Sequence, residues 1–374
     1  MNVFQIKPRV CFGEDALSAL SELQAAHAVI FSDAFMKKSG NTDAIAARMT
    51  GCGEVRVYSE IIPDPPIELI ASALGFLLES DAEVVVALGG GSVIDAAKAT
   101  LLMYRQKTGK KLPLVALPTT SGTGSEVTKF SVITDREAGV KYPLFADEML
   151  PDVAILSAEL TASVPSSITA DTGFDVITHA LEAYISTQAN DFTDAFAEKA
   201  LELAFEYLPR ACRNGNDREA REKMHTASCL AGMAFNDASL GINHGIAHAL
   251  GANFHIPHGR ANAMLLPHVM KYNAGGGQTP SLACKKLARI AHFLGLPCYS
   301  DRAGAASLVA EITRMSRALG IPQSLRDAGV SRADYLAHRD HIVKSAVNDA
   351  CTATNPRTID AHAVEQILAG IERF

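Results

Sequence analysis

Residues 83–99, EVVVALGGGSVIDAAKA, join an apolar run to a glycine turn and then to a helix-forming segment. Residues 84–88 have the composition of a buried strand, the glycines at 89–91 form the turn, and a helix is predicted to begin at Ser92. Glycines let backbone N–H groups approach a phosphate, the serine can cap the helix, and the positive end of the helix dipole faces the anion. The stretch predicts an anion-binding turn that includes Gly90, Gly91 and Ser92.

A second loop of small polar residues follows the next strand-like run, in LPLVALPTTSGTGSEVTKFSVIT (residues 112–134). Its threonines, serines and glycines lie between two apolar segments, which favours an ordered binding loop over a flexible linker. Two such loops at consecutive strand ends are what a nucleotide crevice in an α/β sheet requires. The first loop does not match the dinucleotide fingerprint G-x-G-x-x-G, because Ile94 occupies the final position.

The pattern of elements changes along the chain. Strand-like segments such as AVIFSD (28–33), EVRVYSE (54–60) and the two runs above alternate with helical segments up to about residue 168. Beyond it, long amphipathic segments such as FTDAFAEKALELAFEYLPRA (192–211) dominate. We therefore expect an α/β dinucleotide-binding domain with a mostly parallel, Rossmann-like sheet over residues 1–168, and an all-helical metal-binding domain over 169–374.

Metal-ligating residue types gather in the second of these regions. Asp175 and His179 are four residues apart in TADTGFDVITHALEAYI (169–185), so they project from one helix face. His244 and His248 have the same spacing, and His258 follows in AHALGANFHIPHG (247–259). Imidazole and carboxylate together suit Fe(II) or Zn(II). By spacing alone, His255 is nearly as good a candidate as its neighbours, and Asp171 competes with Asp175.

Composition excludes several other classes. The net charge is −7, from 41 acidic and 34 basic residues, and the basic residues form no stripe along the sequence. The chain therefore lacks the clustered positive charge that nucleic-acid binding requires. The seven cysteines are scattered and include no CxxC pair, which favours free thiols in a reducing compartment. No apolar run is long enough to span a bilayer. We expect a cytoplasmic protein with no membrane partner.

The segments GGGSVIDAAKA (89–99), PTTSGTGSEVT (118–128) and GINHGIAHALGANFHIPHG (241–259), with the Asp175/His179 pair, resemble the iron-dependent alcohol dehydrogenase family across the whole chain. The resemblance implies an NAD(H)-linked enzyme whose metal, Fe(II) or alternatively Zn(II), is held by Asp175, His179, His244 and His258. It also implies nucleotide contacts at Asp33, Asp64, Gly91, Ser92, Asp95, Thr119, Thr120, Thr128, Phe130, Lys141 and Leu160. Relatives commonly carry asparagine where this chain has Asp64.

Two roles can be argued on that basis. Asp33 ends a strand-like segment at the family's position beside the adenosine ribose. A carboxylate there accepts hydrogen bonds from the ribose 2′-OH and repels a 2′-phosphate, so we expect NAD(H) rather than NADP(H). His248 lies one helical turn from His244, and histidine is the side chain most often used for general acid–base catalysis, so it is the candidate catalytic proton relay.

Segments such as KYPLFADEMLPDVAIL (141–156), KMHTASCLAGMAF (223–235) and TATNPR (352–357) resemble the 1-propanol dehydrogenases of propanediol utilisation within this family. We therefore expect reduction of propanal to 1-propanol by a homodimer, inside a bacterial microcompartment and associated with an enzyme that produces the aldehyde. Lactaldehyde reductases and 1,3-propanediol dehydrogenases share the same motifs and remain alternatives. Two rivals are an enzyme of the dehydroquinate-synthase or glycerol-dehydrogenase type and a catalytically idle scaffold protein of an enzyme assembly; the intact ligand set argues against both.

Overall fold

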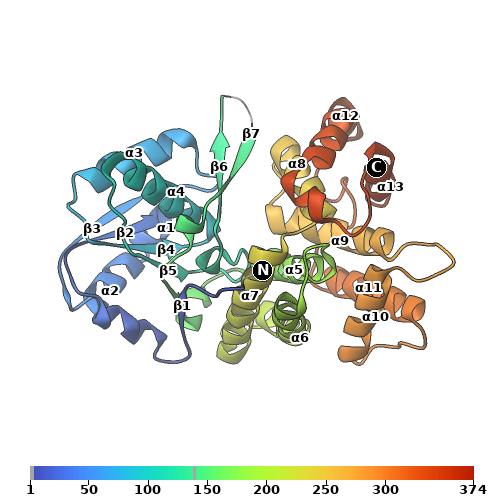
Figure 1. Ribbon diagram of the computed structural model, residues 1–374, viewed down its shortest axis with the longest axis horizontal. Helices are drawn as coiled ribbons and strands as arrows, with labels where there is room; N and C mark the ends of the chain where they lie inside the picture. Colours follow the sequence, from blue (N-terminus) through green and yellow to red (C-terminus); the bar gives the residue numbers. More distant parts are fainter. Residues whose placement is uncertain (1–3, 138–139) are drawn as a thin grey trace. The chain divides into compact units, whose positions relative to one another are not determined.

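The computed structural model describes residues 4–137 and 140–374, and the chain divides into two units, Met1–Ser163 and Val164–Phe374. The N-terminal unit is an α/β structure, and the C-terminal unit is entirely helical (Figure 1). This confirms the predicted fold class, with strands and helices segregated along the chain as the sequence pattern indicates.

A six-stranded, wholly parallel sheet forms the centre of the N-terminal unit. Its strand order is β1-β8-β5-β4-β2-β3. The strands are β1 (Arg9–Phe12), β2 (Ala25–Asp33), β3 (Cys52–Ile61), β4 (Val84–Gly89), β5 (Leu114–Pro118) and β8 (Val153–Leu156). Because β5, β4 and β2 are neighbours and parallel, the residues that follow them lie at one edge of the sheet.

Alternate residues of the central strands pack on opposite faces of this sheet. Val29, Phe31, Val85 and Ala87 belong to a core that includes side chains of α3 (Ile67–Leu78) and α4 (Gly91–Thr108). Ile30, Val86 and Leu88 belong to another core, which includes side chains of α1 (Ala34–Lys38), α2 (Asn41–Arg48) and the 3-10 helices η1 (Ala16–Glu22) and η4 (Ala158–Thr161). Burial on both faces explains why these strands are apolar runs without alternation.

The glycine turn is tighter than the sequence suggests. β4 continues through Gly89 and α4 begins at Gly91, so Gly90 alone stands between them, in the N-cap position. No side chain caps this helix, and the predicted capping role of Ser92 is therefore wrong. A one-residue connection places Ser92 inside the first helical turn, where its hydroxyl is past the capping position.

An antiparallel hairpin, β6 (Phe130–Asp135) and β7 (Val140–Phe145), leaves the parallel sheet after the loop that follows β5. We call residues 119–129 of that loop the hydroxyl loop; it contains the 3-10 helix η2 (Ser125–Val127), and η3 (Asp147–Met149) follows the hairpin. Lys141 lies in β7, but its side chain is outside the described part of the structure.

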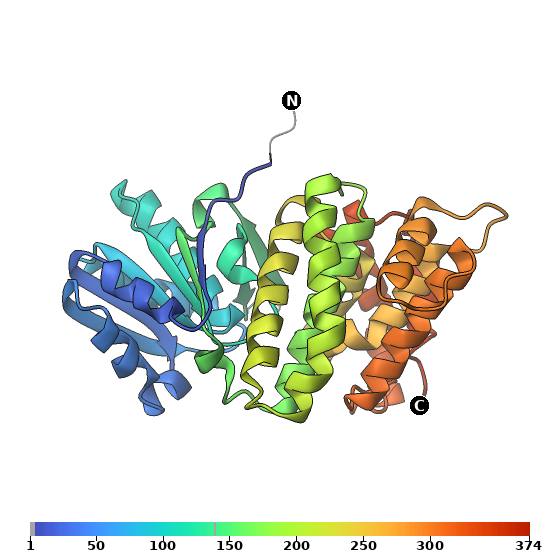
Figure 2. The same ribbon diagram turned by 90° about the horizontal axis from the view of Figure 1, so that it is seen from below.

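The C-terminal unit is built from nine α-helices and one 3-10 helix. They are α5 (Ser166–Ile185), α6 (Asp191–Arg213), α7 (Arg218–Ala238), α8 (Ile242–Phe254), α9 (His258–Ala274), α10 (Leu282–Phe293), α11 (Asp301–Ala318), α12 (Arg332–Asn348), η5 (Ala350–Thr354) and α13 (Ala361–Leu368). Helices α5, α6 and α7 pack side by side (Figure 2).

Helix α5 is the central helix of this unit. It packs against α6, α7, α9 and α10, and nearly every residue from Thr169 to Ile185 is buried. A helix that is surrounded on all sides has no solvent face on which to place its polar residues. Its buried aspartate, histidine and glutamate must therefore find partners inside the unit. Within the described residues, no helix is both long and apolar enough to cross a membrane.

Candidate metal centre

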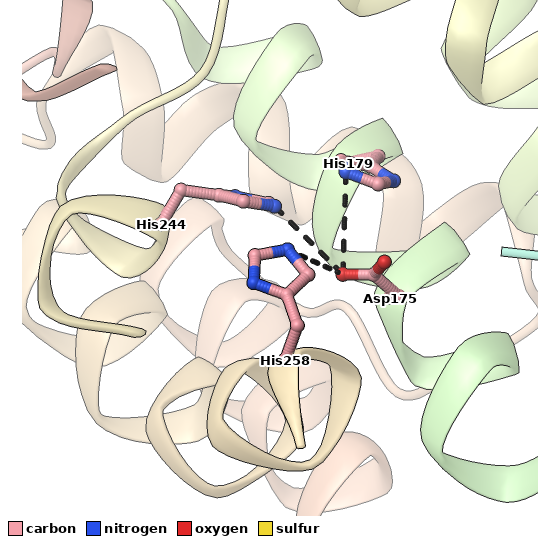
Figure 3. A group of neighbouring side chains, drawn as sticks. All are labelled: Asp175, His179, His244 and His258. Atoms are coloured by element: carbon pink, nitrogen blue, oxygen red, sulfur yellow. Dashed lines mark ion pairs between the residues drawn. The ribbon is translucent and has the colours of Figure 1, made fainter. Parts of the chain in front are cut away.

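Four of the predicted ligands meet in the helical unit. Asp175 and His179 project from α5, His244 from α8, and His258 is the first residue of α9 (Figure 3). One donor atom from each of these residues lies within 4.8 Å of the others. We call these four residues the metal cluster.

Asp175 Oδ1 is the point on which the three imidazoles converge. It lies 4.0 Å from His179 Nε2, 3.8 Å from His244 Nε2 and 3.5 Å from His258 Nε2. Donor atoms that share one Fe(II) or Zn(II) ion at about 2.0–2.2 Å are themselves roughly 3–4 Å apart. The spacing and the nitrogen–oxygen donor set therefore fit a single first-row divalent cation.

The start of α9 brings His258 against α5. A Cβ atom on Gly259 would lie 2.2 Å from the backbone oxygen of Asp171, so only glycine permits this approach of the two helices. Pro257 occupies the N-cap position of α9, and His258 follows it directly. The first residue of a helix that starts directly behind Pro257 therefore supplies the fourth imidazole or carboxylate donor of the cluster.

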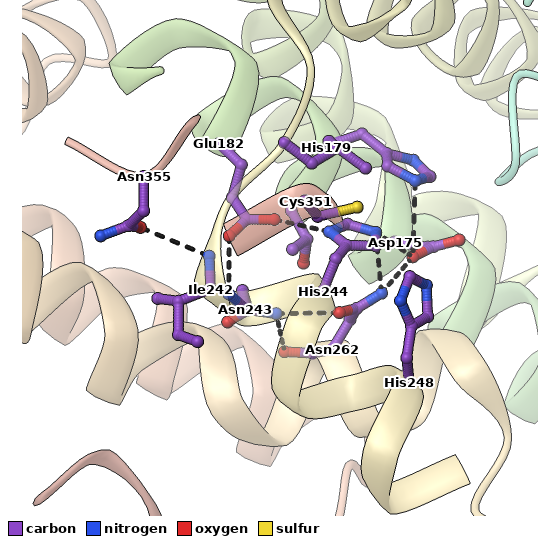
Figure 4. A network of polar contacts seen from close by, with 12 residues as sticks. Asp175, His179, Glu182, Ile242, Asn243, His244, His248, Asn262, Cys351 and Asn355 are labelled. Atoms are coloured by element: carbon purple, nitrogen blue, oxygen red, sulfur yellow. Dashed lines mark hydrogen bonds and ion pairs between the residues drawn. The ribbon is translucent and has the colours of Figure 1, made fainter. Parts of the chain in front are cut away.

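Glu182 orients the imidazole of His244. Its Oε2 lies 2.5 Å from His244 Nδ1, and its Oε1 accepts a 2.7 Å hydrogen bond from the backbone N–H of Asn243 (Figure 4). Burial raises the pKa of Glu182, while hydrogen bonds from the backbone N–H groups of Asn243, His244 and Gly241 act in the opposite direction and favour the carboxylate. Burial, together with the neighbouring imidazoles, lowers the pKa of His244 well below its ordinary value. A neutral His244 with its proton on Nδ1 leaves the Nε2 lone pair facing Asp175.

A chain of amide hydrogen bonds supports that tautomer. Asn243 Nδ2 donates to the backbone oxygen of Asn262, which can only accept, and also to Asn262 Oδ1 at 2.9 Å. The Nδ2 of Asn262 must then point the other way, where it lies 2.7 Å from Asp175 Oδ1 and 3.1 Å from both His244 Nε2 and His258 Nε2. An amide nitrogen only donates, and its two N–H groups are shared among these three neighbours, so both imidazole nitrogens face it with their lone pairs, which is the state that binds a cation.

One side of the metal cluster is open. Asp175, His179 and His244 are buried, whereas the side chain of His258 is 38% exposed. The ring of His248 stacks on that of His258 at 5.3 Å between centroids. An open side beside a partly exposed second imidazole is suited to a small substrate.

Asp349 contacts the Nδ1 edge of the His248 ring. Its Oδ2 lies 2.9 Å from His248 Nδ1, and its Oδ1 accepts from the backbone N–H of Cys351 at 2.8 Å. Burial acts to raise the pKa of Asp349, but the hydrogen bond and charge of His248 and the contacts of Cys351 outweigh it, so the pKa is lowered. Burial raises the pKa of the Cys351 thiol well above its usual range, so this side chain is a neutral neighbour.

The two competing candidates lie outside the metal cluster. Asp171 is paired with Arg260, whose Nε and Nη2 donate to its two oxygens at 3.2 and 2.9 Å. His255 is exposed at the C-terminal end of α8, where its backbone adopts a left-handed conformation. Spacing in the sequence could not separate these residues from Asp175 and His258, because it carries no information about helix crossings.

Half of the predicted nucleotide residues lie at strand ends in the N-terminal unit. Asp33 is the last residue of β2, Gly90, Gly91 and Ser92 follow β4, and Thr119 and Thr120 follow β5. A Cβ atom on Gly91 would lie 2.6 Å from Thr123 Cγ2, so the glycine lets the hydroxyl loop pack onto the start of α4. The structure thus brings together the helix N-terminus and the small polar side chains that a pyrophosphate requires.

The remaining predicted contacts have internal roles or lie apart. Asp95 accepts hydrogen bonds from Ser125 Oγ and from the backbone N–H of Val132. Thr128 Oγ1 and the backbone oxygen of Phe130 accept from Lys98 Nζ. Asp64 lies between β3 and α3 with a φ of 51°, and Leu160 is buried in η4. Asp33, besides ending β2, caps α1 by accepting a hydrogen bond from the backbone N–H of Met36.

Sequence reasoning missed the residues that orient the site: Glu182, Asn243, Asn262, Asp349 and Lys98. Two of them left a signal. Glu182 is three residues beyond His179 on an apolar helix, and Asn262 is four residues beyond His258, so each shares a face with a ligand. Asp349 lies 101 positions from its partner His248, and no local pattern connects them.

A fold with this metal cluster and these strand-end loops defines a metal-dependent dehydrogenase, and the family comparison makes the class specific. The sequence model described as "Iron-containing alcohol dehydrogenase" matches residues 7–158, and "Fe-containing alcohol dehydrogenase family, C-terminal" matches residues 169–371. The chain belongs to the iron-containing alcohol dehydrogenase family, whose enzymes interconvert alcohols and aldehydes.

Individual relatives agree over nearly the whole chain. It is 43% identical to 1-propanol dehydrogenase PduQ of Salmonella typhimurium, over 98% of this chain and 99% of that one. The crystal structure of a 1,3-propanediol oxidoreductase matches with a TM-score of 0.88 and 34% identity, covering 98% of this chain and 99% of the other. Sulfoacetaldehyde reductase from Bifidobacterium kashiwanohense, in complex with NAD+, matches with a TM-score of 0.86 and 28% identity, covering 99% and 98%.

Glu182→Gln tests the orientation of His244. The glutamine amide can donate to Nδ1, which places the imidazole proton on Nε2, the nitrogen that faces Asp175. We expect the affinity for Fe(II) or Zn(II) to fall roughly tenfold to hundredfold, measured by anaerobic titration against a competing chelator.

Two controls frame that measurement. His258→Ala should lose metal binding outright, whereas Glu206→Gln, at an exposed position on α6, should bind metal like the wild type. Unchanged metal affinity in Glu182→Gln, alongside loss in His258→Ala, would show that His244 does not depend on the carboxylate.

Proposed function

We propose that this protein is an NAD(H)-linked, metal-dependent alcohol dehydrogenase that reduces a short aldehyde, with propanal as its main substrate, to the primary alcohol. The observation that supports it most directly is the convergence of three imidazole nitrogens on Asp175 Oδ1, in a chain 43% identical to a 1-propanol dehydrogenase. A scaffold protein has no need of four buried or half-buried donors arranged around one point.

Asp175, His179, His244 and His258 would hold the divalent ion. Bound there, an Fe(II) or Zn(II) ion supplies Lewis acidity to the substrate oxygen. The protein's own contribution is orientation: Glu182 and Asn262 direct two imidazole lone pairs inward, and the burial of Asp175 excludes water from the closed side of the cluster.

His248 would move the hydroxyl proton. Its Nδ1 is engaged by Asp349, so Nε2 is the ring nitrogen left to exchange a proton with the substrate oxygen, directly or through water. The Asp349 carboxylate stabilises the charged imidazole during that exchange. The ring lies beside His258, on the open side of the metal cluster, as a proton relay requires.

The nucleotide would bind at the strand ends of the N-terminal unit. The start of α4 and the hydroxyl loop offer amide and hydroxyl donors to a pyrophosphate. Asp33, at the end of β2, would meet the adenosine ribose. Its carboxylate favours NAD(H) because it would repel a 2′-phosphate.

A substrate panel tests the proposal. Metal-stripped protein is reconstituted anaerobically with Fe(II) or Zn(II), and NADH oxidation is followed with propanal, acetaldehyde, lactaldehyde and 3-hydroxypropanal. We expect metal-dependent turnover with the highest kcat/KM for propanal. A preference for a hydroxylated aldehyde would keep the enzyme class and overturn the substrate. No turnover with any of them would overturn the proposed reaction.

Asp33→Asn tests the choice of nucleotide without removing the helix cap, because asparagine caps helices as well as aspartate does. We expect the ratio of kcat/KM with NADH to kcat/KM with NADPH to fall by about tenfold, the factor that roughly 1.4 kcal/mol of charge repulsion represents. The two kcat/KM values are measured with the same aldehyde. An unchanged ratio would show that Asp33 only caps α1.

His248→Gln tests the proton relay. We expect kcat to fall by roughly 10²-fold or more, the usual contribution of general acid–base catalysis, while metal content and NADH affinity stay unchanged. Steady-state kinetics and metal analysis on the same preparation provide the measurement. A variant that keeps its kcat but loses thermal stability would assign His248 a packing role instead.

A further inference from the structure

A lysine is buried in the middle of α4. Lys98 has no exposed surface, although an ammonium group is costly to bury unless every donor is satisfied. Its Nζ donates to Ser125 Oγ at 2.8 Å, to the backbone oxygen of Phe130 at 2.9 Å and to Thr128 Oγ1 at 3.3 Å. An ammonium has three N–H donors, so Lys98 is saturated by acceptors from residues 125–130 alone.

Asp95, one turn earlier on α4, binds the same segment. Its Oδ1 accepts from Ser125 Oγ at 2.6 Å, its Oδ2 accepts from the backbone N–H of Val132 at 2.9 Å, and its own backbone oxygen accepts from Ser131 Oγ at 2.8 Å. The single hydroxyl of Ser125 donates to the carboxylate and accepts from the ammonium, so both directions are fixed. Helix α4 and the segment from Ser125 to Val132 are thereby joined by oppositely charged groups.

The charges around Lys98 keep it cationic. Burial lowers the pKa of Lys98 to about 8, and the carboxylates of Asp95 and Glu126 act in the opposite direction. Glu126 is itself buried, and burial raises its pKa to about 7. The lysine therefore retains its proton near neutral pH and matches the negative charge of its surroundings.

The segment held in this way belongs to the nucleotide side of the protein. It begins within the hydroxyl loop (residues 119–129), which carries Thr119 and Thr120 and packs through Thr123 onto Gly91 at the start of α4. The position of this segment sets whether the hydroxyl groups of the loop lie beside the N-terminus of α4. The polar atoms of Asp95 and Lys98 are directed at protein groups.

Resting on the proposed use of NAD(H), we propose that Lys98 and Asp95 are positioning residues for the dinucleotide: they fix the hydroxyl loop in the shape that receives the pyrophosphate, and neither touches the nucleotide. Their effect on binding is transmitted through Ser125. This assigns a function to Lys98, and it replaces a direct nucleotide contact by Asp95 with an indirect one.

Lys98→Met is the first variant to make. It keeps most of the length of the side chain and removes the ammonium, so we expect the Kd for NADH to rise roughly tenfold to hundredfold, as expected when hydrogen bonds from a charged donor are lost. NADH fluorescence titration of the metal-free protein gives the Kd. Zn(II) affinity, kcat at saturating NADH and KM for the aldehyde should stay at wild-type values.

Matched variants separate positioning from stability. Lys107→Met makes the same change at an exposed site on α4 and should leave the Kd for NADH unchanged. Ser125→Ala removes the shared hydroxyl without leaving a charge unmatched, and it should weaken NADH binding in the same direction. If Lys98→Met does not fold, the Kd for NADH of Ser125→Ala tests the proposal by itself.

The outcomes are distinguishable from a failure of the proposed function. Wild-type protein that does not bind NADH would overturn the dehydrogenase proposal itself. Wild-type protein that binds NADH, with a wild-type Kd in folded Lys98→Met or in Ser125→Ala, would overturn this inference alone. Loss of NADH and Zn(II) binding together in Lys98→Met would show a general structural role and would also overturn it.

Discussion

The helical unit is organised around one buried carboxylate. Asp175 is only 3% exposed, and its Oδ1 faces the Nε2 atoms of three imidazoles. Because at least two of those nitrogens accept hydrogen bonds, lone pairs converge on the same small space. Such an arrangement is electrostatically unfavourable unless donors or a cation occupy that space. The amide of Asn262 supplies hydrogen-bond donors to this space. A divalent ion would stabilise the converging lone pairs far more, because it carries positive charge.

This constraint explains the architecture around the site. The carboxylate sits on α5, which is buried on all sides, so its partners must come from other helices. Helix α8 brings His244 and α9 brings His258, and the approach of α9 requires Gly259. Helices α5 and α9 therefore pack closer than a side chain at residue 259 would allow, and the position of Gly259 is set by this approach rather than by helix propensity.

Sequence patterns recovered what is local and missed what depends on helix crossings. The strand, turn and helix of residues 83–99 and the Asp175/His179 pair follow from periodicity, because one element contains all the information. Asp171 and His255 could not be excluded as ligands in the same way. Only the fold shows that Asp171 pairs with Arg260 and that His255 lies at the end of α8, away from the metal cluster. The resemblance to a known family resolved that choice, whereas residue spacing left it open.

The predicted cap at Ser92 failed for a related reason. Composition marks a glycine-rich turn but does not say how many of its glycines the strand retains, and here β4 extends through Gly89. Lys98 illustrates the opposite limit. A lysine in a helical segment is normally a solvated residue, and only the fold shows that the segment from Ser125 to Phe130 closes over it.

Hydrogen-bond direction follows the same physical rule in both units. Each chain of contacts contains a group with a fixed role: the backbone oxygen of Asn262 can only accept, and the ammonium of Lys98 can only donate. The backbone oxygen of Asn262 fixes the orientation of the Asn243 amide, which fixes that of the Asn262 amide and then the tautomer of His244. The ammonium of Lys98 fixes the direction in which the Ser125 hydroxyl donates. Buried polar groups arranged in this way have one satisfied arrangement rather than several, and that uniqueness is what a site needs in order to hold a cation or a dinucleotide in one geometry.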